Sequence, residues 1–253
     1  MSEPLTALVT GGARRIGAAI VRDLAAHGWT IAIHCNRSRP EAEALAAEIR
    51  AAGARAVVVA GDLADPNALQ SIVPTAAAAL GPLTLLVNNA SVFLRDRVGG
   101  LDLPRWNAQF DVNLRAPVFL AEAFAAQLPE EWDGNIVNMI DQRVLKLTPE
   151  MTSYTLTKAA LWTATQTLAQ ALAPRIRVNG IGPGPTLPNE HDGGAGMEKE
   201  VEGTLLGRRI DLSYYGRTIR FLVETRAITG HMVALDSGQH LAWRTPDIVD
   251  DEA

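Results

Sequence analysis

The first 28 residues restrict the fold of this chain more than any other stretch. Leu5–Val9 is a short apolar run of the kind that forms a buried strand. A glycine-containing turn, Thr10–Gly17, follows at once, and apolar residues then recur with helical spacing up to Gly28. Glycines in such a unit permit a tight turn and let a pyrophosphate approach backbone N–H groups at the helix start. The stretch therefore predicts a dinucleotide site, and a βα turn without a ligand is the plainer alternative.

The rest of the chain repeats this alternation of strand and helix. Further strands are expected at Thr30–His34, Ala56–Ala60, Leu83–Val87, Ile136–Ile140, Arg175–Ile181 and His231–Leu235. Helices are expected at Glu41–Ala52, Pro66–Leu80, Leu101–Leu128, Ser153–Ala171 and Asp211–Thr225. No repeat or linker divides the 253 residues. The order predicts an α/β fold: a Rossmann-type doubly wound parallel sheet of about seven strands with helices on both faces, in a single domain over residues 1–253.

The end of the second expected strand indicates which cofactor the chain would use. NAD-binding folds usually place an acidic residue there, about 20 residues past the glycines, to hold the ribose 2′-hydroxyl. This chain instead continues as His34-Cys-Asn-Arg-Ser38, without an acid. Arg37 and Ser38, with Arg14 from the glycine turn, would surround a 2′-phosphate through charge-assisted hydrogen bonds. NADP(H) is the expected cofactor, and a pair of solvated arginines is the alternative.

Other strand ends carry polar or aromatic residues that suit ligand contacts. Asp62-Leu63 follows the third strand, where an acid can reach an adenine edge, and Asn88-Asn89-Ala90-Ser91 follows the fourth. Phe93 lies in the loop beyond and either stacks on a flat heterocycle or fills the loop. Asn113 interrupts an otherwise apolar helical pattern, and it needs a partner because an unpaired buried amide costs roughly 1–3 kcal/mol.

The stretch Asn135–Lys158 holds the most reactive combination of side chains. An apolar strand ends on Asp141, where open α/β sheets place their ligands, and the following helix carries Tyr154 and Lys158. The tyrosine and the lysine are four residues apart, so both lie on one helix face. A nearby ammonium would lower the pKa of the phenol toward the range useful for general acid–base catalysis. Taken alone, the spacing also fits an ordinary amphipathic helix.

Glycine, proline and charged residues are concentrated late in the chain. The sixth strand ends in Gly182-Pro-Gly-Pro-Thr186, and residues 187–210 are expected to form a substrate lid. Glu190-His191-Asp192 is an unlikely metal site, because three consecutive side chains point in different directions and no further ligands are evident. No metal is expected.

Composition excludes several other functional classes. The net charge is −5 with no basic cluster, which argues against nucleic acid. A single cysteine, Cys35, rules out an internal disulfide, and no apolar run reaches the ~18 residues that a membrane span needs. The first residues lack the pattern of a signal peptide. A cytoplasmic protein acting on a small molecule is expected.

In combination, these motifs resemble the short-chain dehydrogenase/reductase family over nearly the whole chain. The resemblance is carried by Thr10–Gly17, Asp62-Leu63, Asn88-Asn89-Ala90, Asn113, Tyr154-x-x-x-Lys158-Ala-Ala-Leu161 and Arg177–Gly184. It implies that Tyr154 donates a proton, that Lys158 lowers its pKa and holds the nicotinamide ribose, and that Asn113 supports a proton-relay water. The expected NADPH contacts are Gly11, Arg14, Arg15, Ile16, Gly17, His34, Asn36, Arg37, Ser38, Asp62, Leu63, Asn89, Ala90, Ser91, Tyr154, Lys158, Pro183, Gly184 and Thr186.

Two departures from the usual pattern resemble the pteridine reductase and dihydromonapterin reductase subgroup. Arg15 replaces the middle glycine of the turn, and Asp141 replaces the serine that commonly precedes the tyrosine by about a dozen residues. In that subgroup Phe93 would stack on the pterin, Arg15 and Ser91 would reach its polar edge, and Asp141 would share proton delivery with Tyr154. The expected substrate contacts are Arg15, Ser91, Phe93, Asp141 and Tyr154.

Three functions follow from this sequence. The first is NADPH-dependent reduction of a dihydropterin of the dihydromonapterin, dihydrobiopterin or dihydrofolate type. The second is reduction of a ketone or oxoacyl group, and the third is a regulatory protein that binds NADPH without catalysis. A homotetramer or homodimer is also expected by resemblance, because Phe119, Phe124, Leu161 and Trp162 exceed what one helix face needs for packing.

Overall fold

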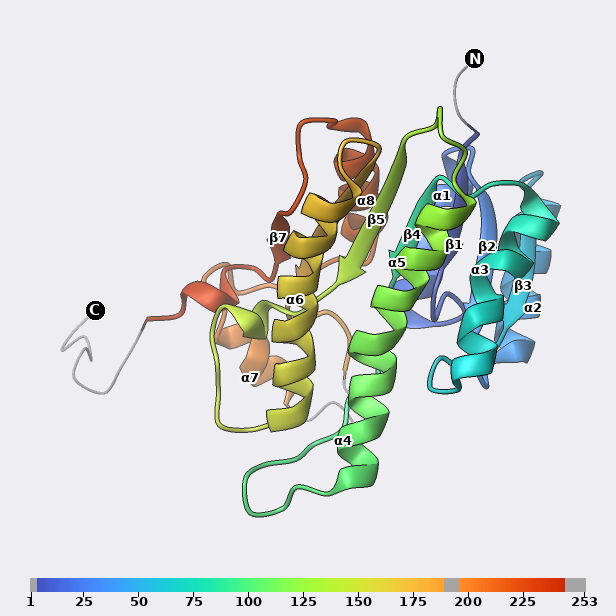
Figure 1. The fold of residues 1–253 in the computed structure, drawn as a ribbon. Helices are drawn as coiled ribbons and strands as arrows, with labels where there is room; N and C mark the ends of the chain where they lie inside the picture. The colour runs from blue at the N-terminus through green and yellow to red at the C-terminus, as the bar shows by residue number, and fades with distance from the viewer. Residues whose placement is uncertain (1–3, 189–195, 244–253) are drawn as a thin grey trace.

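The computed structural model describes residues 4–188 and 196–243, and it confirms the expected α/β architecture (Figure 1). Seven strands form one parallel sheet in the order β3-β2-β1-β4-β5-β6-β7. The strands are β1 Thr6–Val9, β2 Thr30–Cys35, β3 Ala56–Ala60, β4 Leu85–Asn88, β5 Gly134–Met139, β6 Ile176–Pro183 and β7 Met232–Leu235. β1 lies inside the sheet, where Ala7 pairs with Ile31 of β2 and Leu85 of β4. The strand order reverses at β1, which leaves a crevice beyond the carboxyl ends of β1 and β4.

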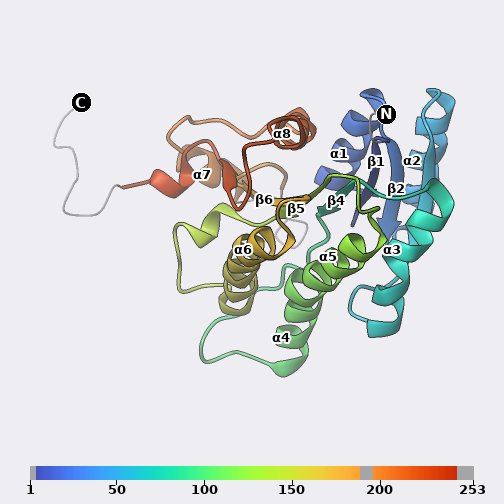
Figure 2. The same cartoon turned by 45° about the horizontal axis from the view of Figure 1, so that its top comes forward.

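Helices cover both faces of this sheet, as the sequence predicts (Figure 2). They are α1 Arg15–Ala26, α2 Arg39–Ala51, α3 Pro66–Leu80, α4 Leu103–Phe110, α5 Ala116–Gln127, α6 Thr152–Leu172, α7 Met197–Glu202 and α8 Ser213–Glu224. Shorter turns of helix are η1 Asp111–Arg115, η2 Gln142–Val144 and η3 Gln239–Leu241. Helices α1, α2 and α8 pack on one face, and α3, α5 and α6 pack on the other.

The central strands are apolar throughout because both of their faces are buried. In β1, Ala7 and Val9 contribute to the core beneath α1, α2 and α8, whereas Leu8 contributes to the opposite core. All three side chains have 0% exposure. Two hydrophobic layers therefore hold the sheet rigid, and its carboxyl edge becomes a fixed platform for the loops that follow each strand.

One expected helix is interrupted. Residues 101–128 form α4 and α5 joined by η1, a turn of π-helix centred on Asn113. A π turn widens the helix locally and is common at functional sites. Here it occurs where the buried Asn113 amide leaves the regular pattern to bond the loop after β4.

Two residues cited in favour of subunit contacts belong instead to the core of this chain. Phe124 has 0% exposure and Leu161 has 1%, so neither side chain is available to a second subunit. Of the four residues, Phe119 is 56% exposed, whereas Trp162 is partly buried against the core. The interpretation failed because the helices α5 and α6 pack against each other as well as against the sheet, so each buries more than one face.

Residues 189–195 of the expected lid lie outside the described residues, including Glu190, His191 and Asp192. The described remainder of that region contains the short helix α7. None of the described helices is long and apolar enough to cross a membrane. The cytoplasmic location and the absence of a nucleic-acid partner stay predictions.

Candidate active site

A cavity of about 500 Å³ opens at the carboxyl ends of the strands on either side of β1. Its wall consists of Gly11, Arg14, Arg15, Ile16, Gly17, His34, Asn36, Arg37, Asp62, Leu63, Asn89, Ala90, Ser91, Val92 and Val112. All of these except the two valines were expected from the sequence to contact NADPH. The residues come from the turns after β1, β2, β3 and β4, together with η1. We refer to this space as the cofactor cavity.

The glycine turn at this cavity is held by side chains of neighbouring strands. A Cβ at Gly17 would lie 2.2 Å from the carbonyl oxygen of Gly11, so only glycine fits there. The amide of Asn89 donates to the carbonyls of Thr10 and Gly11 at 2.8 and 3.1 Å. In return, the Thr10 hydroxyl oxygen accepts hydrogen bonds from the backbone N–H groups of Asn89 and Ala90. The turn is therefore set before any ligand arrives.

His34 joins three strand ends beneath the cavity. Its Nδ1 accepts a hydrogen bond from the N–H of Gly11 at 3.2 Å, so the proton of the neutral ring is on Nε2. Nε2 then donates to the carbonyl of Gly61 at 3.0 Å. The side chain is 1% exposed. Burial lowers the pKa of His34 from 6.5 to about 4, although the Gly61 carbonyl and Asp62 oppose that shift.

The groups around this cavity fit a phosphorylated dinucleotide. Helix α1 begins at Arg14 without a side-chain cap and has no acidic residue in its first turn, so its N-terminus suits an anion. Arg14 and Arg37 both line the wall, and no carboxylate follows β2. Ser38 does not line the wall and instead occupies the N-cap position of α2. The donor set is that of a 2′-phosphate site, with two guanidinium groups in place of the usual acid.

A second cavity of about 450 Å³ adjoins the first and shares Arg15, Ile16 and Ser91 with it. Its other lining residues are Phe93, Asp141, Gln142, Arg143, Tyr154, Pro183, Gly184, Pro185, Leu187, Gly196, Met197, Glu200 and Gln239. All five expected substrate contacts lie on this wall. We call this space the substrate cavity.

Asp141 and Tyr154 meet in the substrate cavity. The phenol of Tyr154 donates to Oδ2 of Asp141 at 2.9 Å, and Oδ1 accepts from the N–H of Arg143 at 2.8 Å. Burial and the charge of Asp141 raise the pKa of Tyr154 well above 10, whereas Arg143 and a hydrogen bond from Ser91 act in the opposite direction. This result reverses the direction that the family resemblance implied, because burial disfavours the phenolate and the Asp141 carboxylate adds to that effect.

Lys158 lies behind the tyrosine. Its Nζ donates to the carbonyl of Met139 at 2.8 Å and is 5.7 Å from the centre of the Tyr154 ring. Burial lowers the pKa of Lys158 to about 8, and Asp141 partly offsets the shift. Lys158 lines neither cavity in this structure, and the same holds for Asn113.

Asn113 braces the loop that separates the two cavities. Its Oδ1 accepts from the N–H of Val92 at 2.7 Å and from the hydroxyl of Ser91 at 3.2 Å. Its Nδ2 donates to the Val92 carbonyl at 2.7 Å. The amide that the sequence flagged as needing a partner is therefore fully occupied, and Ser91 is held between the cavities.

These elements match a family with a known architecture. Residues 5–193 match the family described as short chain dehydrogenase. The chain belongs to that family. It is thus an oxidoreductase.

Solved structures and curated sequences indicate different branches of this family. FolM alternative dihydrofolate reductase 1 from Brucella canis, crystallised with NADP, is 56% identical, with a TM-score of 0.91 over 97% of this chain and 98% of that one. A short chain dehydrogenase from Burkholderia cenocepacia in complex with NADP is 36% identical, with a TM-score of 0.87 over 94% and 99%. The 3-oxoacyl-[acyl-carrier-protein] reductase FabG of Staphylococcus aureus is 27% identical over 93% of this chain and 98% of its own length.

Arg15 of this short-chain dehydrogenase occupies a backbone conformation that favours glycine. Its φ is 54°, in the left-handed region, which costs a residue with a Cβ roughly 1–2 kcal/mol. The side chain crosses to the other side of the cavity and donates to the carbonyl of Pro188 at 2.8 Å. A strained residue that lines both cavities fits a role in ligand binding.

Several residues of this dehydrogenase's substrate cavity were missed by sequence reasoning. Gln142, Arg143 and Gln239 come from segments far apart in the chain and belong to no motif. Leu187, Met197 and Glu200 fall within the lid expected over residues 187–210, but they were not named individually. Conversely, Thr186 was expected at the cofactor, but its hydroxyl donates to the Gly184 carbonyl and pairs with the hydroxyl of Tyr215. Phe93 packs edge-on against Tyr154, with ring centres 4.7 Å apart and an interplanar angle of 88°.

Proposed function

We propose that this protein is an NADPH-dependent reductase of dihydropterins, of the dihydromonapterin, dihydrobiopterin or dihydrofolate type. The observation that carries this proposal is the carboxylate of Asp141, which accepts the phenolic hydrogen of Tyr154 in the substrate cavity. A serine at that position would donate to a ketone oxygen, whereas an ionised carboxylate accepts from N–H groups. Pterin rings present such groups along one edge. The similarity to the Brucella FolM proteins supports the same substrate class.

NADPH is the proposed cofactor because the cationic groups of the cofactor cavity suit its phosphates. Arg14 and Arg37 line the cofactor cavity, and relatives with the same fold were crystallised with NADP. The loop of Ser91 forms part of both cavities, so the two ligands would meet beside Tyr154. When bound, NADPH supplies the hydride for the reduction.

In this reaction the protein's own residues supply one proton. Reduction of a C=N bond adds a hydride to carbon and a proton to nitrogen. Burial and Asp141 keep the phenol of Tyr154 protonated, so it serves as the proton source. Asp141 and Tyr154 share one hydrogen bond, so the carboxylate acts directly on the proton of the phenol. Lys158, held on the carbonyl of Met139, places a positive charge that stabilises the phenolate left after transfer.

The cavity walls would also fix the orientation of a flat heterocycle. The Phe93 ring, held edge-on to Tyr154, leaves a face that can stack on a pterin. Arg15 brings donors to the same space, and Ser91 is held there by Asn113. We further propose that α7 belongs to a substrate lid, because Met197 and Glu200 line the cavity.

Reduction of an oxoacyl group is the second candidate. It is favoured by the similarity to FabG of S. aureus along nearly the entire length of both chains. If the substrate is an oxoacyl group, its carbonyl oxygen would have one hydrogen-bond donor, Tyr154, because the carboxylate at position 141 only accepts. A regulatory NADPH-binding protein is a weaker alternative, since Tyr154, Lys158 and Asn113 are all present.

The test is NADPH consumption with a panel of dihydropterins, dihydrofolate, quinones and β-keto esters. We expect kcat/KM to be largest for a dihydropterin. A β-keto ester reduced much faster than any pterin would contradict the proposal and favour the second candidate. Turnover of no member, together with tight NADPH binding, would favour the regulatory alternative.

We also propose assembly into a homotetramer or homodimer. Phe119 and Leu156 are 56% and 45% exposed on α5 and α6, the two helices that lie side by side in both views. Large apolar side chains on adjacent exposed helices suit a subunit contact. Sedimentation at micromolar concentration checks this, and a monomer would refute it.

A further inference from the structure

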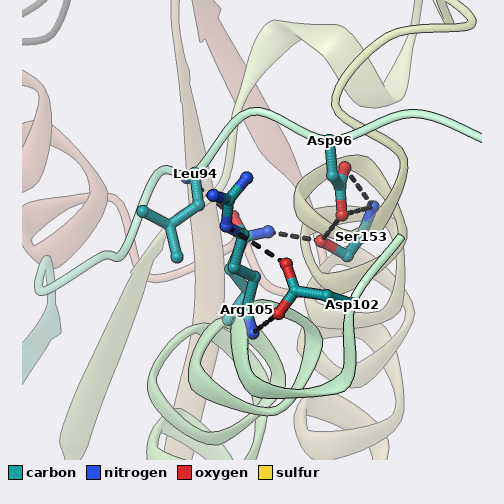
Figure 3. Close-up of polar contacts among 6 residues, drawn as sticks. Leu94, Asp96, Asp102, Arg105 and Ser153 are labelled. Atoms are coloured by element: carbon teal, nitrogen blue, oxygen red, sulfur yellow. Dashed lines mark hydrogen bonds and ion pairs between the residues drawn. The ribbon is translucent and has the colours of Figure 1, made fainter. Parts of the chain in front are cut away.

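Asp96 is a buried acid that belongs to neither cavity. It lies in the loop that leaves Phe93, between the exposed residues Arg95 and Arg97, yet only 9% of it is exposed. An acid without partners in such a place would be costly to bury. Its carboxylate is instead aimed at the start of α6, the helix that carries Tyr154 (Figure 3).

Helix α6 begins without a cap of its own. The N-cap residue, Met151, has a φ of 58° in the left-handed region, and its side chain makes no capping bond. The cap comes from Asp96: the N–H of Ser153 donates to the two carboxylate oxygens at 3.1 and 3.3 Å. The N–H of Met151 donates to the carbonyl of Asp96 at 2.7 Å. A residue more than 50 positions away thus fixes the first turn of α6, and its charge suits the positive end of the helix dipole.

Ser153 and Gln109 complete a closed hydrogen-bond network around Asp96. The Ser153 hydroxyl donates to Oδ2 of Asp96 and accepts from Nε2 of Gln109. Oε1 of Gln109, on α4, accepts from the N–H of Leu94 at 3.1 Å. Gln109 and Ser153 both have 0% exposure, so every group in the network is satisfied by protein alone. Satisfied buried networks rigidify the elements that they join.

The network joins the two side chains that touch each other in the substrate cavity. Ser153 directly precedes Tyr154, and Leu94 directly follows Phe93. The network therefore fixes the backbone next to each of the two rings, Phe93 and Tyr154, which meet in an edge-to-face contact. A small displacement of the first turn of α6 would move the phenol relative to Asp141, which it contacts through one hydrogen bond of 2.9 Å.

We propose that Asp96 is a positioning residue that sets the Tyr154 phenol against Asp141 and Phe93 by capping α6 from the substrate loop. The inference rests on the proposed function in one respect, namely that Tyr154 is the proton donor. Asp96 touches neither the phenol nor the cavities. Its effect passes through Ser153 and the helix start.

The chain offers a matched control on the same loop. Asp102 caps α4, where its Oδ1 accepts from the N–H of Arg105 at 3.1 Å (Figure 3). It also pairs with the Arg105 guanidinium at 3.1 Å, and its side chain is 43% exposed. Asp102 has the same chemistry and the same capping role as Asp96, but it does not contact α6. Loss of its cap would affect stability without moving Tyr154.

The experiment compares Asp96→Asn with Asp102→Asn. Asparagine keeps the shape of the side chain, but one acceptor oxygen becomes an NH₂ group that faces the donors of Ser153. With the panel substrate that the wild type reduces best, Asp96→Asn should lower kcat by roughly tenfold or more, since small misplacements of a catalytic group are expensive. The pH profile should shift and the KM for NADPH should change less than about twofold, because the cofactor cavity is untouched. Asp102→Asn should match the wild type in all three respects.

A second readout does not depend on turnover. Fluorine NMR of protein containing 3-fluorotyrosine gives one signal for each of the three tyrosines, and Tyr154→Phe assigns the one from position 154. Asp96→Asn should shift or broaden that signal, whereas Asp102→Asn should not. If the wild type reduces no panel substrate, the proposed function fails, and this measurement still decides the role of Asp96.

Ser153→Ala covers the case in which Asp96→Asn does not fold. It keeps the backbone N–H that donates to Asp96 and removes only the hydroxyl between Asp96 and Gln109. We therefore expect smaller changes in kcat, in the pH profile and in the Tyr154 fluorine signal. A variant of Asp96 or Ser153 that lowers Tm while leaving kcat, the pH profile and the Tyr154 signal unchanged would overturn the proposal, because Asp96 would then be a structural cap only.

Discussion

The two cavities of the active site are adjacent, yet they are built in different ways. The wall of the cofactor cavity comes from short turns directly after strands of the sheet, and its geometry is set by uncharged contacts of Thr10, His34 and Asn89. The substrate cavity takes its wall from longer loops and from α7, and charged residues such as Asp141, Arg143 and Glu200 line it. The fold itself fixes the first cavity, whereas the second depends on which side chains the loops carry.

This contrast extends to the proton chemistry. In the cofactor cavity, burial keeps His34 neutral, so its ring acts as a fixed donor and acceptor. In the substrate cavity, burial and a neighbouring charge act on Tyr154 together, and the group is prepared to transfer a proton. One family fold can thus keep the same cofactor while changing substrates, because the two requirements are met by separate segments.

The largest effect is expected from removal of the phenol. Tyr154→Phe preserves the ring contact with Phe93 but deletes the proton source, and turnover should fall by roughly 10²–10⁴. Because Tyr154 lies outside the wall of the cofactor cavity, the KM for NADPH should hardly change. Steady-state kinetics check both values. Tyr214→Phe is the control, since Tyr214 is 47% exposed on α8 and should retain full activity.

Replacement of the carboxylate tests whether the substrate cavity selects pterins. Asp141→Ser restores a hydroxyl donor, so it should slow pterin reduction by about tenfold or more while leaving or improving ketone reduction. Asp141→Asn removes the charge at constant size and should slow pterins and shift the pH profile. The informative quantity is the ratio of kcat/KM between the two substrate classes. An unchanged ratio in Asp141→Ser would remove the main chemical support for the pteridine reductase proposal.

The same contrast explains what could be predicted from the sequence. The sheet, its flanking helices and most of the cofactor wall followed from the alternation of strands and helices and from short motifs, because a turn after a strand can reach only one edge of the sheet. Asp141, Tyr154 and Phe93 were also found, since each follows a strand or begins a helix. The boundary between α4 and α5 could not be predicted from the sequence, because the π turn at Asn113 does not change the spacing of the apolar residues.

Other parts of the site depend on tertiary contacts that no local pattern encodes. Arg143 in η2 and Gln239 in η3 both reach the substrate cavity, although several strands and helices separate them along the chain. Asp96 had no motif to mark it, and its role emerged only when its carboxylate was seen at the start of α6. The direction of the Tyr154 pKa shift could not be predicted from the sequence either, because it depends first on how deeply the phenol is buried and then on the Asp141 carboxylate beside it.

A more selective effect, confined to one cofactor, is expected on the cofactor side. Arg37→Ala should raise the KM for NADPH by roughly 10–100-fold, the equivalent of one charge-assisted hydrogen bond to a phosphate, and leave the KM for NADH nearly unchanged. Arg39→Ala is the control, because Arg39 is exposed on α2 and pairs with Glu43 rather than lining the cavity. Equal losses with both cofactors would mean that Arg37 only supports the local structure.

The smallest expected effect is a pH dependence of stability centred on His34. The pKa of His34 is about 4 in the folded protein and near 6.5 in the unfolded chain, so the unfolded chain binds the proton more readily. Its contribution to stability is complete above pH 6.5 and is lost progressively as the pH falls toward about 4. Between about pH 7.5 and about pH 6, the loss should amount to roughly 1 kcal/mol in the free energy of unfolding.

Urea unfolding of wild type, His34→Gln and His27→Gln across that pH range isolates this contribution. Glutamine at position 34 does not titrate, so the variant should lose about that share of the pH dependence, although it will be less stable overall. His27 is exposed at the end of α1, and His27→Gln should behave as the wild type does. NADPH affinity should stay constant over this range and fall only as the pH approaches about 4, where the folded protein's ring takes up a proton. A proton on Nδ1 of His34 would then displace the N–H of Gly11 from the turn that lines the cofactor cavity. If the His34→Gln protein keeps the wild-type pH dependence of stability, burial does not lower the pKa of His34, and that pH dependence must come from another group.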